Sequence, residues 1–313
     1  MVSQCHNMHF AYQSALSSVA CMTAEIRNPS TKHKLIGVST LLASALSNQV
    51  GAALGALAFP VIGTLGVVSI RQLIAAGVLV GIARPRFRTL TRAQWWPILL
   101  LGAVFGMMNI CLYAAIDRLG LALAVTLEFL GPLGVAMAMS RRWLDAVCGI
   151  IALAGVVLLT DPQPSSDFTG IALGLAAAGA WAAYILLNRV VGARVPGLRG
   201  TSAAATVSAI LWTPIALVVL VSINWVASVS SLLLGLACGV LSSAVPYIAD
   251  LITLRRLPPA LFGVLMSINP VYAALVGLII LHQRLAANEW AGIAVIVAVN
   301  ALITVIPGRQ HRR

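Results

Sequence analysis

The chain consists largely of apolar runs separated by short polar breaks, and this pattern limits the folds open to it. A helix that rises about 1.5 Å per residue needs about 20 apolar residues to cross a bilayer. Most runs are that long, so we predict an all-α polytopic membrane protein without a soluble domain. We expect ten helices, over residues 36–59, 61–83, 95–116, 120–139, 145–160, 169–188, 201–223, 229–254, 259–281 and 289–306.

Composition supports a membrane protein. Hydrophobic residues make up 60% of the chain and charged residues 9%, with a mean hydropathy of +0.98, whereas soluble domains carry about 25% charged residues. The net charge is +12. The basic residues that produce it lie between apolar runs and form no aromatic–basic module, so we expect no nucleic-acid partner. The five cysteines are odd in number and contain no C-x-x-C, which predicts neither a disulfide framework nor a zinc site.

The basic residues predict the orientation of the helices. If the N-terminus lies inside, only Arg118 and Arg284 of the 20 Lys and Arg residues fall in outer loops, and Arg71 falls within a helix. The others lie on the inner side, so we predict that both termini are cytoplasmic. Residues 1–34 are polar and predict a mobile cytoplasmic extension, or sequence before a later start at Met8 or Met22. The sequence leaves open whether the chain forms a homodimer.

Two distant segments resemble each other. When residues 251–276 are aligned with 114–139 at a shift near 138, Arg256 meets Arg118 and Pro270 meets Pro132. Ten helices divide into two sets of five, and an odd number in each makes the copies antiparallel, as in many transporters. We therefore predict two inverted five-helix repeats around a central cavity. The expected units are the extension 1–34, a first repeat 35–160, a linker with the sixth helix 161–188, the rest of the second repeat 189–306, and a basic tail 307–313.

The stretch TLEFLGPLG carries an acid and a helix breaker within an apolar run. Glu128 falls near mid-membrane, where an ionised acid costs about 2.5–3.5 kcal/mol. A group placed there can exchange a proton or hold a substrate ammonium; the alternatives are an acid that is always protonated and one paired with Arg71. Pro132 removes one helical hydrogen bond and frees the carbonyl four residues earlier, which is that of Glu128. Pro246 and Pro270 repeat this feature, so we expect kinks at the cavity.

Other polar residues within apolar runs are candidates for the same site. Asp250 follows Tyr247 on one helix face and is either a second proton site or gate, or an interfacial partner of Arg255 or Arg256. Arg71 either binds a carboxylate or has a structural role as an ion pair or a cap on backbone carbonyls, because arginine in lipid needs a permanent partner. The remaining candidates for cavity lining are Asn48, Asn109, Trp181, Tyr184, Tyr247 and Asn269. For the aromatic residues the alternative is packing or an interfacial belt, and for the amides it is helix–helix hydrogen bonding.

Three strings of the sequence resemble a known family. TLEFLGPLGVAMAMSRR, LSSAVPYIADLITLRRLP and FGVLMSINPVYAALVGLIIL look like the EamA-type branch of the drug/metabolite transporter superfamily, over about Ser47 to Ile306. The resemblance implies a ten-helix inverted-repeat fold in the bacterial inner (plasma) membrane. It also implies proton-coupled export of small metabolites, such as the amino acids threonine and homoserine. The chain departs from the pattern at Asn269, where the family has an acid, and at His282 and Gln283.

No enzyme constellation is found in the sequence. There is no H-E-x-x-H, G-x-S-x-G or Walker lysine motif, so we expect neither catalysis nor a cofactor or metal. The leading prediction is a secondary exporter that works by alternating access, driven by protons. The alternatives are efflux of drugs or cations by the same fold, and a non-transporting polytopic enzyme or scaffold.

Overall fold

A computed structural model describes residues 31–85, 87–139, 143–161, 167–195, 197–222, 225–253, 256–257 and 259–305. These residues form helices only, which confirms the predicted all-α class for the described part of the chain. Nearly all of the expected extension 1–34 and the whole tail 307–313 lie outside it. Large apolar side chains such as Val221 and Ile279 are exposed on the outer surface, as contact with lipid requires.

Seven of the described segments are long and apolar enough to cross a membrane. They are Leu35–Ala83, Arg92–Leu119, Leu121–Ala138, Phe168–Arg194, Arg199–Ser222, Ser228–Ala249 and Leu261–Ile280. Two shorter apolar helices, Val147–Thr160 and Ala287–Ile303, accompany them.

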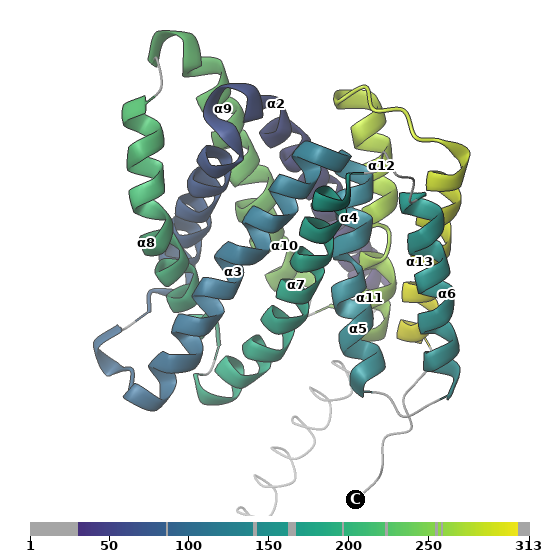
Figure 1. The fold of residues 1–313 in the computed structure, drawn as a ribbon. Helices are drawn as coiled ribbons and strands as arrows, with labels where there is room; N and C mark the ends of the chain where they lie inside the picture. Colours follow the sequence, from purple (N-terminus) through teal and green to yellow (C-terminus); the bar gives the residue numbers. More distant parts are fainter. Residues whose placement is uncertain are drawn as a thin grey trace, which may run out of the picture.

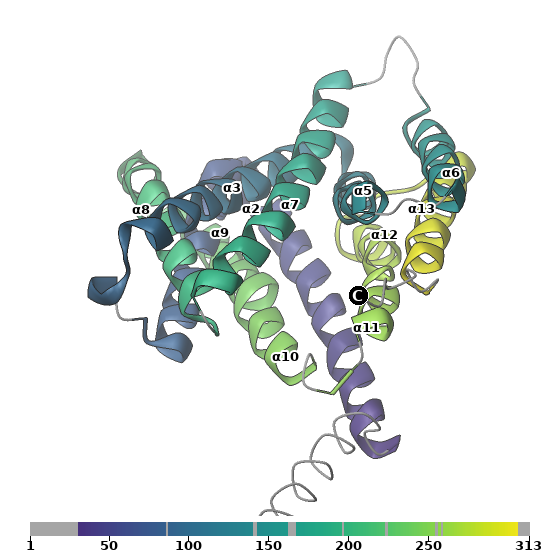
Figure 2. The same ribbon diagram turned by 90° about the horizontal axis from the view of Figure 1, so that it is seen from below.

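The chain forms a bundle in which segments far apart in the sequence lie side by side (Figure 1). Helices α6 and α13 pack as a pair at one edge, and α8 lies at the opposite edge (Figure 2). Helix α7 runs to Arg194, beyond its predicted end at 188, and the extended backbone of Val195 ends it. The elements are α2 (Thr31–Ala83), η1 (Phe87–Thr89), α3 (Arg92–Leu119), α4 (Leu121–Glu128), α5 (Leu130–Met139), α6 (Trp143–Thr160), α7 (Phe168–Arg194), α8 (Arg199–Ser222), α9 (Trp225–Gly239), η2 (Val240–Ala244), α10 (Val245–Thr253), α11 (Pro259–Met266), α12 (Asn269–Ile280) and α13 (Ala287–Val305).

Helix α2 consists of two helices that meet at Gly63. The φ angle of Gly63 is 67°, outside the helical region, and Pro60 lies just before it. A Cβ on Gly55 would lie 3.0 Å from Cγ1 of Val67, although twelve residues of straight helix span about 18 Å. The two halves of α2 therefore fold back against each other. Gly120, with φ of 86°, makes a similar turn between α3 and α4.

The helix is interrupted within three apolar segments, and each interruption lies just before a proline at which the sequence predicts a kink. Helix α4 ends at Glu128, four residues before Pro132, and α11 ends at Met266, four residues before Pro270. The third segment passes through the π-turn η2 just before Pro246. Proline has no N–H to donate to the carbonyl four residues earlier, so each interruption leaves backbone acceptors without a helical donor.

The largest apolar cluster packs around Tyr113, which is fully buried. The rings of Phe59 and Tyr113 meet edge to face, with centroids 5.9 Å apart. Ile116 and Leu121, which flank the turn at Gly120, belong to the same cluster. The bundle is therefore densely packed near the turns at Gly63 and Gly120, the end that the charge pattern predicts to be outside.

Candidate functional site

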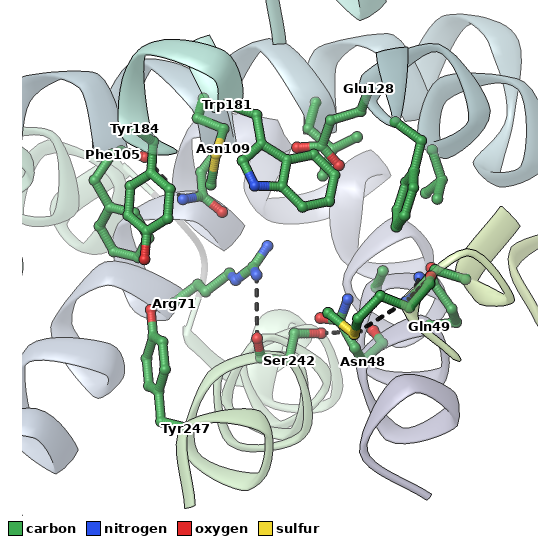
Figure 3. A pocket seen from close by; sticks show the side chains of 17 residues that line it. Asn48, Gln49, Arg71, Phe105, Asn109, Glu128, Trp181, Tyr184, Ser242 and Tyr247 are labelled. Atoms are coloured by element: carbon green, nitrogen blue, oxygen red, sulfur yellow. Dashed lines mark hydrogen bonds between the residues drawn. The ribbon is translucent and has the colours of Figure 1, made fainter. Parts of the chain in front are cut away.

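A cavity of about 170 Å³ lies inside the bundle, between helices from both halves of the chain. Its walls come from α2, α3, α4, α7, η2, α10, α11 and α12 (Figure 3). Among its lining residues are eight that the sequence nominated: Asn48, Arg71, Asn109, Glu128, Trp181, Tyr184, Tyr247 and Asn269. The side chain of Asp250 lies outside the described part of the structure, although its backbone belongs to α10.

The prolines contribute through the carbonyl groups that they free. Pro246 frees the Ser242 carbonyl, which accepts from Nη2 of Arg71 at 3.1 Å. In the same π-helical turn the Leu241 carbonyl accepts from Oγ of Ser47 at 2.9 Å. Before Pro270, the Met266 carbonyl accepts from Nδ2 of Asn269 at 2.8 Å. In both places a side chain replaces the missing backbone donor, so the kinks fix cavity side chains in position.

Arg71 is anchored by three hydrogen bonds to other helices. Besides the bond to Ser242, its Nε donates to Oγ of Ser243 at 3.2 Å and its Nη1 to the hydroxyl of Tyr113 at 3.1 Å. Its guanidinium also lies 5.3 Å from the centre of the Tyr113 ring. A guanidinium has five N–H groups, so two remain for a ligand. Arg71 thus provides a fixed positive charge at the cavity wall.

Glu128 lies across the cavity from this charge. Its side chain is 7% exposed and faces the cavity near Trp181 (Figure 3). Among the described residues it makes no hydrogen bond, and the one ion pair within 4 Å joins Arg118 in the last turn of α3 to Asp167 at the start of α7. Within the described residues no ion pair joins Glu128 to Arg71. The cavity therefore presents a cation and an acid that do not neutralise each other directly.

Aromatic side chains separate this cavity from a second one of about 410 Å³. The rings of Phe129 and Trp181 meet edge to face at 4.8 Å, and both residues line the two cavities. The second cavity lies between α5, α7, α11 and α13, and Pro132 contributes to its wall. Tyr184 also lines both, and its ring stacks on Phe105 at 5.9 Å. These aromatic side chains therefore belong to the wall that the two cavities share.

Several lining residues were not nominated from the sequence. Gln49 is an amide in an apolar run, directly beside the nominated Asn48, so the same reasoning could have found it. Ser242 and Met266 lie four residues before Pro246 and Pro270, so the rule that pointed to the backbone carbonyl of Glu128 points to theirs as well. Phe105 and Met108 carry no such signal, because apolar residues in an apolar helix do not reveal which face is the cavity wall.

Comparison with known proteins agrees with this architecture. Residues 168–305 match the EamA-like transporter family. The chain is 36% identical over 276 residues to the threonine/homoserine exporter RhtA of Salmonella typhimurium (strain SL1344), covering 86% of this chain and 92% of the exporter. It is 36% identical over 261 residues to RhtA of Escherichia coli (strain K12), covering 82% and 88%.

More distant relatives extend the comparison. The chain is 25% identical over 236 residues to the uncharacterized transporter YwfM of Bacillus subtilis (strain 168), covering 71% of this chain and 78% of that protein. A solved crystal structure, 22% identical with a TM-score of 0.55, covers 89% of this chain and 99% of its own, and shares the fold. The named relatives are exporters and transporters rather than enzymes. The chain is therefore an integral membrane protein of the EamA-like transporter family.

Proposed function

We propose that this protein exports small amino acids, such as threonine or homoserine, across the bacterial inner membrane, coupled to protons and by alternating access. The observation that carries the proposal is that Arg71 and Glu128 line one cavity without forming an ion pair with each other. An amino acid is a zwitterion, so its carboxylate and its ammonium each need a partner of opposite charge. The printed names of the 36% identical relatives point to the same cargo.

The site residues have complementary roles in this proposal. The substrate carboxylate binds the two N–H groups of Arg71 that the protein does not use. The ammonium binds at Glu128, where it replaces a proton as the neutralising charge. A buried carboxylate that carries neither is costly, so release of cargo on one side favours uptake of a proton from that side. Export of one amino acid is thereby linked to entry of a proton.

The inverted-repeat architecture belongs to the proposal as well. The first span divides at Gly63, and counting its halves and the two shorter helices gives ten. Added Cβ atoms on Gly37 and Gly170 would meet equivalent partners, Leu257 in one case and Leu119 in the other. These contacts support two repeats of residues 35–160 and 161–306, in which the first helix of each packs against the other repeat. They also support the boundaries that the sequence predicts for the two repeats.

The contacts at the loop ends fit the proposed topology. Gln94 donates to the Arg194 carbonyl, and both residues lie in segments predicted to be cytoplasmic. Arg118 pairs with Asp167, and both lie in segments predicted to be outside. The dense cluster around Tyr113 then closes the outer end of the cavity. The second cavity lies in the half predicted to be cytoplasmic, which supports a conformation that loads cargo from inside.

The test uses purified protein in lipid vesicles loaded with labelled threonine. We expect the wild type to release threonine faster when the outside is acidic. Glu128→Gln keeps the shape of the side chain but cannot exchange a proton, so we expect transport to lose its response to the pH gradient. Glu289→Gln is the matched control, because Glu289 caps the start of α13 away from the cavity, and it should respond like the wild type. Native pH dependence in Glu128→Gln contradicts the mechanism, and movement of lipophilic cations alone favours the drug-efflux alternative.

A further inference from the structure

The amide of Asn269 is held in one orientation by the backbone. Asn269 lies at the start of α12, directly before Pro270, and its Nδ2 donates to the Met266 carbonyl at 2.8 Å. A carbonyl oxygen can only accept, so the nitrogen of the Asn269 side chain must face Met266. Its Oδ1 is therefore turned toward α2.

The orientation of Gln49 follows from that of Asn269. Nε2 of Gln49 donates to Oδ1 of Asn269 at 3.0 Å, and since Oδ1 can only accept, the Gln49 amide cannot be reversed either. This leaves Oε1 of Gln49 as the free end. Gln49 is 2% exposed and lines the cavity, and its Oε1 has no hydrogen-bond partner among the described residues. A buried acceptor in this state is costly unless a ligand supplies a donor.

A second acceptor of the same kind lies on the other side of the cavity. Asn109 is 1% exposed, its Nδ2 donates to the Phe105 carbonyl at 2.8 Å, and its Oδ1 has no partner within the described part of the chain. Figure 3 shows Asn109 on the side of Arg71 and Gln49 on the opposite side, beyond Asn48. Near Arg71, the cavity thus has two acceptors for the α-ammonium of a substrate, Asn109 and Glu128. Gln49 is one further acceptor, and it is neutral.

We propose that Gln49 is the specificity-determining residue of the site, that its Oε1 accepts from a donor on the substrate side chain, and that Asn269 positions it. The inference rests on the proposed amino-acid transport and adds a residue that selects among amino acids. A hydroxyl on the side chain satisfies Gln49, whereas a methyl group in the same place leaves the acceptor buried and unpaired. Threonine and valine differ in this way, as do homoserine and norvaline.

The experiment is competition for labelled threonine transport in vesicles that contain the full-length protein. The inhibition constants of each hydroxyl compound and its methyl analogue give a preference ratio. We expect a ratio of at least about tenfold in the wild type, the effect of one buried acceptor left unpaired. Gln49→Met keeps the length of the side chain but removes the acceptor, so we expect its ratio to fall to near one.

Gln72→Met is the matched control. Gln72 is also a buried amide, 1% exposed, with an unpaired Oε1 and an Nε2 that donates to the Phe105 carbonyl. It does not line the cavity, so we expect its variant to keep the wild-type ratio. Asn269→Leu should lose the preference, because leucine has no acceptor to hold the Gln49 amide in position.

The outcomes separate this inference from the proposed function. A wild type that transports threonine but binds valine equally well overturns the role of Gln49 and leaves amino-acid export intact. A wild-type preference that persists in Gln49→Met also overturns it. If the wild type moves no amino acid at all, the proposed function fails first. A wild-type ratio near one overturns the role of Gln49 even if a variant does not fold.

Discussion

Gly131 lies where α5 passes α7 beside the cavity. A Cβ on Gly131 would overlap the backbone carbonyl oxygen of Ala178 and lie 3.2 Å from Cβ of Trp181. Gly134, three residues further along the same helix, would have nothing within 4 Å of an added Cβ. Gly131→Ala and Gly134→Ala therefore add the same methyl group to the same helix, one against a neighbouring backbone and one into open space.

The two substitutions should change stability in opposite directions. Replacing a helical glycine by alanine stabilises a helix by about 0.5–1 kcal/mol, and at Gly134 nothing opposes this gain. At Gly131 the obstacle is backbone, which cannot rotate away as a flexible side chain can. Helix α5 must move from α7, and overpacking of this kind costs about 1–3 kcal/mol. We expect a net loss of about 1 kcal/mol or more, together with slower transport because the Phe129–Trp181 contact at 4.8 Å is disturbed.

The measurement is the midpoint of thermal unfolding of each purified variant in the same detergent, followed by threonine transport in vesicles. Gly134→Ala should unfold at or above the wild-type temperature and transport normally. Gly131→Ala should unfold at a lower temperature. If Gly131→Ala is at least as stable as Gly134→Ala, the close packing of α5 on α7 is not the constraint that the structure indicates.

Two further predictions concern charged groups. Arg71→Lys keeps the charge but replaces a planar guanidinium by one nitrogen, so it should lose up to two of the three interhelical hydrogen bonds. At about 0.6 kcal/mol for each bond, we expect the free energy of unfolding to fall by about 1 kcal/mol and the KM for threonine to rise. An unchanged KM would contradict the role of Arg71. At the exposed loop, the backbone N–H of Gly170 and then Arg118 hold the pKa of Asp167 below its usual range. The ionised form therefore stabilises the fold above the unfolded pKa of about 4, and this contribution is lost as the pH falls through the lower folded pKa. Asp167→Asn keeps the helix cap, so it should be slightly less stable than the wild type at pH 7 and equal to it in strong acid; a constant difference in thermal unfolding at both pH values would argue against the ion pair.

Sequence reasoning located the helices because apolar runs in lipid have few alternatives. It also gathered much of the site, since a polar side chain in a membrane helix must face something other than lipid. Eight residues nominated from the sequence, from Asn48 to Asn269, line one cavity. The choice did not require knowing which helices are neighbours, so one sequence was enough to make it.

What the sequence could not provide was the register between helices. The bond from Gln49 to Asn269 joins residues 220 positions apart, and only the packing of α2 on α12 brings them together. The π-turn at Val240–Ala244 was equally hidden, because it depends on how Ser47 and Arg71 reach the carbonyls that it exposes. The interpretation of Arg71 as a cap on backbone carbonyls was available from chemistry, but its partners were not.

The proposed repeats place different chemistry on equivalent backbone. With the shift of 138, Pro132 corresponds to Pro270, Gly131 to Asn269 and Glu128 to Met266. In the second copy the carbonyl freed by the proline is taken by Asn269, which in turn fixes Gln49 as a neutral acceptor. In the first copy glycine offers no such donor, no side chain among the described residues binds the Glu128 carbonyl, and Glu128 itself brings a carboxylate to the wall. Two similar kinks therefore give an anionic acceptor on one side and a neutral one on the other, and this asymmetry suits a cargo with an ammonium at one end and an uncharged donor at the other.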